Sequence, residues 1–302
     1  MSSLGDIAEI NPDSSQAQPV AICISASSDL SFAAAVTFIN FIQIHGAKGF
    51  SFRFFSDSKL PRMEKIFRDL GADFQVELYK PPVSWRKLWG SRAIAYFSPL
   101  VLAKFEGFKL LSSYPTVVWL DYDIVITKPI SELWERDDFD IAFPGSSQSV
   151  KNGFITLPPG INGDLEGMSA GVMSFKRSFS GHKEAKEKLY KLFSLYSSSL
   201  YYPEQAIFDI FFQTHISSRR WKLGEKFGAE PGKESNLNAI VHGYGPRKFW
   251  NGRLNASWNE YFFLWLELGG WGWNPHRTRL AKLVRGLKHL IARFQLSFWS
   301  PS

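Results

Sequence analysis

Strand-like and helix-like segments alternate through the first part of the chain, and this alternation constrains the fold more than any other feature. Short apolar runs predict strands at residues 19–25, 50–55, 74–78 and 116–121. Segments with helical periodicity separate them, at residues 32–44, 62–70 and 93–111, the last broken near Pro99. Strands joined through helices of this length require right-handed crossovers. The sequence therefore predicts an α/β fold, with a mostly parallel, Rossmann-like sheet flanked by helices.

The second part of the chain is less regular. We expect strands at residues 139–143, 171–175 and 238–242, a helix capped by Ser180 that runs to about residue 196, and a helix that Pro203 opens through residue 212. Residues 217–234 are polar and contain glycine, so they read as a loop. Like residues 145–167, this segment matches no motif that we can interpret.

Composition indicates which cellular compartment the protein occupies and whether it spans a membrane. The single cysteine, Cys23, excludes a disulfide framework within the chain and fits a reducing compartment. Residues 1–18 are polar and acidic, unlike a signal peptide. No run of about eighteen apolar residues is present, so no membrane-spanning segment is expected. We expect a cytoplasmic protein.

The net charge of +7 belongs to the C-terminal end of the chain. Residues 268–302 contain six basic residues and no acidic one, and the rest of the chain is nearly neutral. Seven apolar residues there recur with helical spacing: Leu280, Leu283, Val284, Leu287, Leu290, Ile291 and Phe294. Basic residues surround this stripe: Arg279, Lys282, Arg285, Lys288 and Arg293.

This pattern predicts a basic amphipathic helix that lies peripherally on an anionic membrane, with Trp271, Trp273, Phe298 and Trp299 at headgroup depth. The inner, cytoplasmic face of a membrane is the expected location. The alternative is a helix packed on the rest of the protein with its basic edge in solvent.

Two carboxylates interrupt an apolar run at residues 117–126. Side chains two positions apart share one side of a strand, so Asp121 and Asp123 can reach one point. Ligands of parallel sheets bind beyond the carboxyl ends of the strands, where these residues are expected. Paired carboxylates suit Mg²⁺ or Mn²⁺. The alternative is a strand that ends in a turn capped by Asp123.

A second cluster surrounds His242, which ends a short apolar strand. Its imidazole can bind a metal, Gly243 and Gly245 allow close backbone approach, and Lys248 offers a charge to a phosphate. A histidine beside glycines is also common as an ordinary loop residue. After the first strand, residues 25–29 (SASSD) replace the glycine-rich Gly-x-Gly-x-x-Gly turn. That replacement argues against a dinucleotide-binding Rossmann enzyme.

The chain resembles the retaining glycosyltransferases of family 8, which include glycogenin-like enzymes and lipopolysaccharide galactosyl- and glucosyltransferases. The resemblance spans residues 19–250 and rests on four ordered blocks. They are residues 119–125 (WLDYDIV) with 130–134 (ISELW), residues 169–173 (SAGVM), residues 203–207 (PEQAI) and residues 242–250 (HGYGPRKFW).

The resemblance implies a GT-A fold, a UDP-sugar donor and Mn²⁺, or Mg²⁺, held by Asp121, Asp123 and His242. Other positions that match the family's donor site are Ala26, Asp29, Lys104, Tyr122, Ser169, Ala170, Gly171, Gly245 and Lys248. Glu204, Gln205 and Lys248 match its catalytic positions, with Gln205 near the anomeric carbon and Lys248 at the leaving diphosphate.

Several of these positions also have simpler explanations. Asp29 or Ser31 would serve as a helix cap, Ala170 and Gly171 as close packing, and Glu204 as an acidic residue in a first helical turn. The chain departs from the family in three places: Ser169 replaces asparagine, Lys104 arginine and Phe249 proline. Lysine keeps the charge but loses the two-pronged geometry of arginine.

The resemblance implies transfer of a hexose, galactose or glucose, to a hydroxyl of a glycan or glycolipid with retention of configuration. An inverting enzyme or another nucleotide-sugar enzyme on this fold is the nearest alternative, and Glu204, Asp164 or Glu166 would then act as base. A non-enzymatic protein that binds nucleic acid or membrane through its basic tail is the alternative of another class. Because the chain before residue 268 is nearly neutral, no nucleic-acid partner is expected. We expect a polar N-terminal segment at 1–18, a nucleotide-sugar transferase domain at 19–260 and an aromatic, basic membrane-association segment at 261–302.

Overall fold

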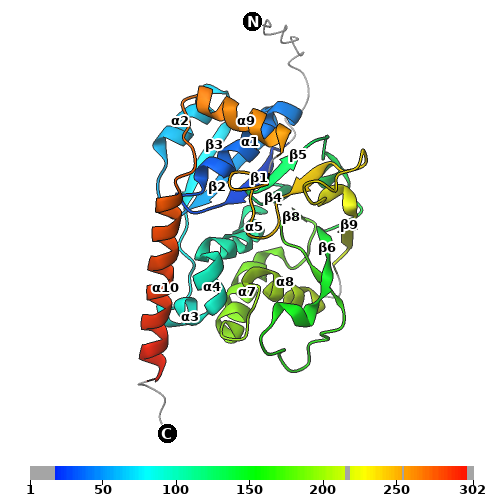
Figure 1. The fold of residues 1–302 in the computed structure, drawn as a ribbon. Helices are drawn as coiled ribbons and strands as arrows, with labels where there is room; N and C mark the ends of the chain where they lie inside the picture. Colours follow the sequence, from blue (N-terminus) through cyan, green and yellow to red (C-terminus); the bar gives the residue numbers. More distant parts are fainter. Residues whose placement is uncertain (1–17, 215–217, 254, 298–302) are drawn as a thin grey trace, which may run out of the picture.

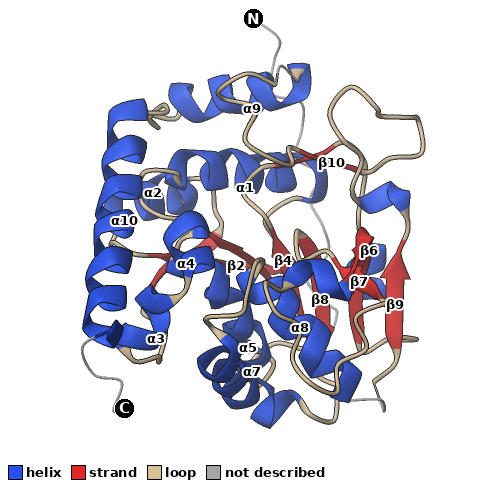
Figure 2. Cartoon of the chain, turned by 60° about the horizontal axis from the view of Figure 1, so that its bottom comes forward, coloured by secondary structure: helices blue, strands red, loops and turns tan. Residues whose placement is uncertain are grey.

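The computed structural model describes residues 18–214, 218–253 and 255–297. A mixed sheet forms the middle layer, with helices on both faces (Figures 1 and 2). The strands are β1 (Val20–Ser25), β2 (Phe50–Ser56), β3 (Asp73–Leu78), β4 (Thr116–Leu120), β5 (Ile124–Ile126), β6 (Ile141–Ser149), β7 (Glu166–Met168), β8 (Val172–Lys176), β9 (Arg220–Leu223) and β10 (Ile240–His242).

Ten α-helices and three 3₁₀ helices lie within the described ranges. The α-helices are α1 (Ser31–His45), α2 (Pro61–Asp69), α3 (Trp85–Gly90), α4 (Arg92–Phe97), α5 (Gly107–Leu110), α6 (Glu132–Glu135), α7 (His182–Tyr196), α8 (Pro203–Thr214), α9 (Ala256–Glu267) and α10 (Pro275–Ser297). The 3₁₀ helices are η1 (Pro99–Glu106), η2 (Val150–Gly153) and η3 (Glu225–Phe227).

The main sheet has the order β3-β2-β1-β4-β8-β6-β7. Strands β3, β2, β1 and β4 run parallel, as the alternation of strand and helix patterns predicts. Strand β8 is antiparallel to both β4 and β6, and β9 adds to β6 in parallel. The sheet is therefore a parallel half joined to an antiparallel half at β4.

A separate hydrophobic core lies against each face of the sheet. On one face α1, α2 and α9 enclose a cluster rich in aromatic residues, including Phe38, Phe67 and Trp265 (Figure 2). On the other face η1, α5, α7 and α8 enclose a second cluster around Phe105 and Phe208. Strand β4 contributes to both, since Val118 and Leu120 face the first cluster and Val117 and Trp119 the second. Its end is thus held in place from both sides.

A two-stranded sheet lies beside the end of β4. Strand β10 pairs antiparallel with β5, and His242 is opposite Ile124. The buried side chain of Asn40 in α1 fixes β5, since its Nδ2 donates to the Ile126 carbonyl (2.9 Å) and its Oδ1 accepts from the Ile126 amide (2.6 Å). This small sheet brings the segment that follows residue 240 back to the segment that follows residue 120.

Some sequence-based expectations for the second part are wrong. Residues 217–234 contain β9 and η3 in addition to loop, because β9 gains its hydrogen bonds from β6, far away in the chain. Helix α7 starts at His182 after Gly181, with no side-chain cap, so Ser180 does not cap it. Helix α9, which the sequence did not indicate, packs on α1 and buries Trp258 and Trp265.

Helix α10 stands along α3 and α4 at one side of the molecule (Figure 1). A narrow side of the helix makes this contact. Arg285 Nε donates to the Ala95 carbonyl (3.3 Å), His289 Nδ1 lies 2.7 Å from the Trp89 carbonyl oxygen, and Ala292 is buried. Arg285 therefore faces the protein and is only partly exposed, contrary to its predicted place on the basic rim.

The seven residues of the apolar stripe on α10 are all exposed. Trp271 and Trp273 instead contact the protein: the Trp271 carbonyl accepts from Trp265 Nε1 (2.9 Å), and Trp273 Nε1 donates to Thr278 (3.2 Å). Phe298 and Trp299 lie outside the described residues. No helix in the described ranges combines the length and apolar composition needed to cross a bilayer.

Candidate functional site

The two aspartates lie in a turn between β4 and β5 and not within one continuous strand. Strand β4 ends at Leu120, and the Asp121 amide donates to the Gly171 carbonyl (2.8 Å). The Asp123 carbonyl accepts from the Gly243 amide (2.8 Å), which ties the turn to the loop after β10. The convergence predicted from strand alternation is therefore produced by a turn held on both sides.

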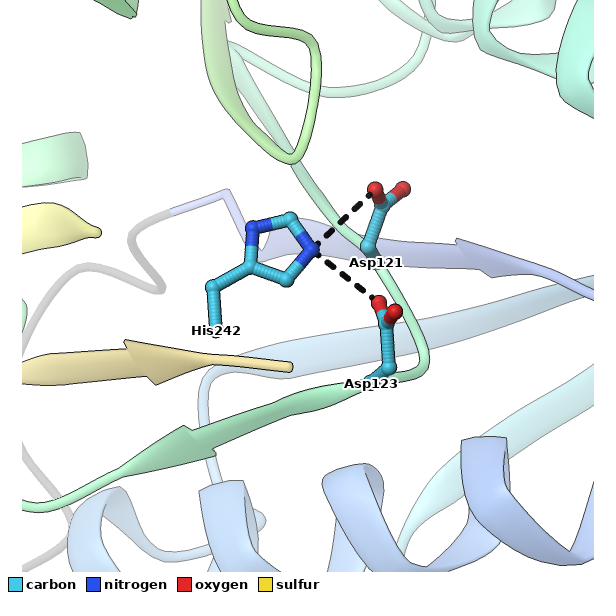
Figure 3. Close-up of side chains that lie close together, drawn as sticks. All are labelled: Asp121, Asp123 and His242. Carbon is cyan, nitrogen blue, oxygen red and sulfur yellow. Dashed lines mark hydrogen bonds and ion pairs between the residues drawn. The ribbon is translucent and has the colours of Figure 1, made fainter. Parts of the chain in front are cut away.

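Three ligand-type atoms meet at this turn (Figure 3). His242 Nε2 lies 3.1 Å from Asp123 Oδ1 and 3.7 Å from Asp121 Oδ2. Potential ligand atoms of the three residues all lie within 4.8 Å of one another. His242 and Asp123 are buried, and the Asp121 side chain retains 27% of its exposure. The cluster therefore opens toward solvent on the side of Asp121.

A lysine holds the other oxygen of each carboxylate. Lys104 Nζ lies 2.8 Å from Asp121 Oδ1, and Lys248 Nζ contacts Asp123 Oδ2. Lys248 also donates to the Gly243 carbonyl (3.0 Å). Each carboxylate thus has one oxygen fixed by an ammonium group and the other directed at His242. The two lysines fix the orientation of the carboxylates and leave the oxygen that faces His242 free to bind a cation.

Electrostatics keep Asp123 and Lys104 charged. Burial disfavours the Asp123 carboxylate, but the charges and hydrogen bonds of His242 and Lys248 outweigh burial and hold its pKa well below the usual range. Burial likewise disfavours the Lys104 ammonium, while Asp121 and Glu204 raise its pKa above the ordinary value. An ionised Asp123 is the form that binds a metal.

Gly171 is required by the packing of the imidazole. A Cβ at this position would lie 2.3 Å from His242 Cε1, 2.7 Å from its Nδ1 and 3.3 Å from Asp121 Oδ2. Only glycine lets the segment after β7 approach the histidine this closely. The glycine in the block at 169–173 is thus explained by the site and not only by ordinary strand packing.

The donor set fits a divalent cation such as Mn²⁺ or Mg²⁺. Two carboxylate oxygens and one imidazole nitrogen face one point, and oxygen donors with a single histidine are typical of Mn²⁺. Three protein ligands leave coordination positions for other oxygens.

Lys104 is the centre of a second set of contacts. Its buried ammonium group binds the Ala170 carbonyl (2.8 Å) and Glu204 Oε1 (3.2 Å) as well as Asp121. It therefore links η1, the segment at 169–171 and the start of α8. The side-chain amide of the neighbouring Gln205 has no hydrogen-bond partner among the described residues, and Gln205 is only partly buried. That amide is free to bind a ligand.

The predicted nucleoside contacts Ala26 and Asp29 follow β1, and Tyr122 lies within the turn itself. Ala26 is buried after β1, and its amide donates to the Phe55 carbonyl (3.1 Å). Asp29 is half-buried and caps no helix, since α1 begins without a side-chain cap, which removes the alternative explanation for Asp29 and Ser31. Tyr122 is half-buried, its ring 6.0 Å from that of Trp250.

The remaining predicted residues border the His242 loop. Burial raises the pKa of the Tyr244 hydroxyl above its ordinary value, and a hydrogen bond with Ser169 opposes this shift. The Tyr244 ring packs on His242 with 3.9 Å between ring centroids. Gly245 has φ 79°, a left-handed conformation that favours glycine. Phe249 is buried against Trp258, which accounts for an aromatic residue where the family often has proline.

Sequence reasoning missed the role of Asp209. This buried carboxyl on α8 accepts a hydrogen bond from the Met168 amide (2.9 Å) and so holds the strand that leads into 169–171. Burial raises its pKa to about 7, with the Met168 hydrogen bond opposing. A single acidic residue within the apolar stretch 206–212 was the available signal.

Comparison with known proteins agrees with this geometry. The family model described as glycosyl transferase family 8 matches residues 22–253. The structure is similar to that of the galactosyltransferase LgtC, solved with donor and acceptor sugar analogs (TM-score 0.60, 15% identity, 86% of this chain and 99% of LgtC). A search of curated proteins found no match.

Two further structures share the fold. One is the glycosyltransferase GlyE of Streptococcus pneumoniae (TM-score 0.58, 14% identity, 82% of this chain and 62% of GlyE). The other is the bifunctional glycosyltransferase WbbM (TM-score 0.60, 15% identity, 86% of this chain and 52% of WbbM). Since the family model covers most of its length, the chain belongs to glycosyltransferase family 8 and is a glycosyltransferase.

Proposed function

We propose that this enzyme transfers a hexose, galactose or glucose, from a UDP-sugar to a hydroxyl of a glycan or glycolipid, with retention of configuration. The observation that carries the proposal is the arrangement of Asp121, Asp123 and His242 around one point, with Lys248 beside it. A nucleotide-sugar donor brings a diphosphate, and this is the group that a divalent cation and an ammonium group hold together.

Each residue of the site has a role in this reaction. A bound Mn²⁺ or Mg²⁺ would supply positive charge to the diphosphate leaving group. Lys248 adds an ammonium charge next to Asp123, and Gly245 exposes backbone for phosphate oxygens. Ala26, Asp29 and Tyr122 hold the nucleoside, and Ser169, Ala170 and Gly171 border the sugar. Removing one such electrostatic contact typically costs about 3–4 kcal/mol of transition-state stabilisation.

The ion pairs favour retention over inversion. An inverting enzyme needs a carboxylate base, and the three candidates each contact a lysine: Glu204 with Lys104 (3.2 Å), Asp164 with Lys151 (2.9 Å) and Glu166 with Lys222 (2.6 Å). Asp164 is also 85% exposed. Gln205, whose side-chain amide has no hydrogen-bond partner among the described residues, would steady the sugar in this proposal. We therefore favour front-side attack, with the acceptor hydroxyl assisted by a donor phosphate oxygen.

We also propose that residues 261–302 attach the transferase domain, residues 19–260, to the inner, cytoplasmic face of a membrane. The seven-residue apolar stripe on α10 is exposed by 43–71%, and no acidic residue interrupts the helix. Five basic residues of α10 are exposed, namely Arg277, Arg279, Lys282, Lys288 and Arg293, and Lys288 also lies over the Trp89 ring. Near an anionic bilayer each contributes about 1 kcal/mol, before burial of the stripe adds more.

The decisive test of the activity is Mn²⁺-dependent hydrolysis of a panel of nucleotide sugars, beside Asp123→Ala and His242→Ala. One donor should be hydrolysed by the wild type and by neither variant, and its anomeric product, followed by NMR, should retain configuration. Calorimetric titration of UDP with and without Mn²⁺ gives an independent readout. An inverted product would favour the inverting alternative. Absence of both hydrolysis and Mn²⁺-dependent UDP binding would refute the assignment of the site.

The membrane proposal is tested separately by sedimentation with vesicles. The wild type should bind vesicles containing phosphatidylglycerol and not neutral phosphatidylcholine vesicles, and Leu283→Glu with Leu287→Glu should abolish binding. Leu195→Glu changes an exposed leucine on α7 and serves as the matched control. Salt-dependent binding of duplex DNA without vesicle binding would instead support the nucleic-acid alternative.

A further inference from the structure

A row of aromatic side chains lies on the surface next to the start of α8. It consists of Tyr96, Phe97, Tyr202 and Tyr201, and we call it the aromatic row. The ring centroids are 4.8 Å apart for Tyr96 and Phe97, 6.1 Å for Phe97 and Tyr202, and 5.0 Å for Tyr202 and Tyr201. Tyr96 is 69% exposed and Tyr201 58%. Exposed apolar surface that is contiguous marks interaction sites more often than scattered residues do.

The backbone holds both halves of the row in place. Ser98, directly after Phe97, has φ 95° and is the one non-glycine residue of the described chain with a positive φ. Such a conformation costs of the order of 1–3 kcal/mol and persists where the surroundings impose it. In the other half, the amides of Tyr201 and Tyr202 both donate to the Gly153 carbonyl (2.8 and 3.1 Å). The rings are therefore mounted on fixed backbone.

A hollow beside the row combines aromatic and hydrogen-bonding groups. It is lined by Gln148, Lys151, Asn152, Phe154, Tyr201 and Tyr202. Asn152 Oδ1 accepts from Ser149 (2.7 Å), which leaves its amide hydrogens for a ligand, and the Gln148 side chain has no partner among the described residues. Amides donate and accept hydrogen bonds, and tyrosine offers an apolar ring with a polar end. Sugars present the matching surfaces, a C–H face and a rim of hydroxyl groups.

The row and the hollow adjoin the reaction site. Phe97 and Ser98 lead into η1, which carries Lys104, and Tyr202 directly precedes the helix that carries Glu204 and Gln205. The segment that carries Asn152 and Phe154 also packs against α8 next to Gln205, because a Cβ at Gly153 would lie 3.0 Å from that of Ala206. The row and the hollow are therefore built on the same elements as Lys104, Glu204 and Gln205.

We propose that the aromatic row and its hollow bind the acceptor, and that the acceptor is an oligosaccharide of two or more sugars. The inference rests on the proposed function, since it extends that site. Neighbouring rings of the row are 4.8–6.1 Å apart and inclined by 57–85°, so they present separate faces that more than one sugar ring can contact. The outer rings bind sugars away from the reacting hydroxyl, and the amides of the hollow select their hydroxyl groups.

The experiment compares wild type with Tyr201→Ala and Tyr96→Ala on an array of oligosaccharides and the corresponding monosaccharides. Phe263→Ala is the matched control, since Phe263 is 61% exposed on α9, away from the row. Wild type should bind a set of oligosaccharides at least tenfold more tightly than any monosaccharide. Both tyrosine variants should lose about tenfold in glycan affinity, and in the acceptor KM once an acceptor is known, while Phe263→Ala should lose nothing.

Mn²⁺-dependent UDP binding by calorimetry separates the two proposals. If UDP binds to all four proteins and the tyrosine variants bind every glycan as wild type does, the acceptor assignment is wrong and the proposed function survives. Wild type that binds UDP but no oligosaccharide, or that binds monosaccharides equally well, also overturns the inference. Loss of UDP binding in wild type itself would refute the proposed function.

Discussion

Replacing Gly171 with alanine tests whether His242 must lie where the structure has it. The new Cβ would stand 2.3 Å from His242 Cε1, whereas carbon atoms in contact are separated by about 3.5–4.0 Å. The imidazole must therefore move by roughly 1.2 Å or more. The backbone cannot yield easily, because the Gly171 carbonyl accepts the Asp121 amide hydrogen bond. A histidine displaced this far no longer faces both carboxylates.

We expect Gly171→Ala to weaken Mn²⁺ binding about 10–100-fold, the usual effect of disturbing the orientation of a metal ligand. Misplacement of about 1 Å also predicts roughly a hundredfold loss of donor hydrolysis. Calorimetric titration of Mn²⁺ in the presence of UDP measures the first effect. Overpacking by itself destabilises by about 1–3 kcal/mol, so thermal unfolding must be measured for the same variant.

Gly107→Ala is the matched control for Gly171→Ala. Its Cβ would lie 3.1 Å from Phe175 Cε2, in the core and away from His242. This variant should lose stability without losing affinity for Mn²⁺. If Gly171→Ala binds Mn²⁺ and UDP as wild type does, the imidazole is not constrained as described, and the assignment of His242 as a ligand fails.

Three further perturbations follow from the same contacts. Lys104→Met leaves Asp121 and Glu204 without their cation and should destabilise by about 3 kcal/mol, measured by urea unfolding, whereas Lys104→Arg should recover part of that loss. Asp209→Asn tests the raised pKa of about 7. Because native Asp209 keeps a proton that the unfolded chain releases above about pH 4, wild-type stability should fall by up to about 4 kcal/mol between pH 4 and pH 7. The asparagine variant should lack this component, and parallel unfolding profiles would contradict the burial argument. Asn40→Ala removes both bonds to Ile126 and should cost about 2–3 kcal/mol, with weaker Mn²⁺ binding because β5 supports β10; unchanged unfolding in urea would show that other groups hold β5.

The parallel half of the fold was predictable because local signals and tertiary packing agree there. Strands β1 and β4 are apolar except for Ser25 and Thr116 at their ends and are almost wholly buried, so periodicity and length identify them. Strand β9 (RWKL) is short and partly polar, and only its pairing with β6 makes it a strand. Helix α9 has apolar residues on several sides and few charges, so it shows no clear helical stripe.

The cluster of Asp121, Asp123 and His242 was predictable in its residues but not in its backbone. The predicted strand at 116–121 ends within one residue of β4, but nothing local indicates that residues 124–126 form a separate strand. The pairing of β5 with β10 decides this, and it joins segments more than a hundred residues apart. The contact of Lys104 with Glu204 is of the same kind. The exposed pairing of Phe97 with Tyr202 was likewise invisible in the sequence.

The contact of α10 with α4 has a consequence for the geometry of the reaction. Helix α4 ends in Tyr96 and Phe97, and Arg285 ties α10 to the Ala95 carbonyl immediately before them. If α10 lies on a bilayer as proposed, the aromatic row is held at one fixed height and inclination relative to the lipid surface. The enzyme would then select membrane-borne glycans by length. It would elongate those whose reactive end reaches that height and leave shorter ones with the same terminal sugar unmodified.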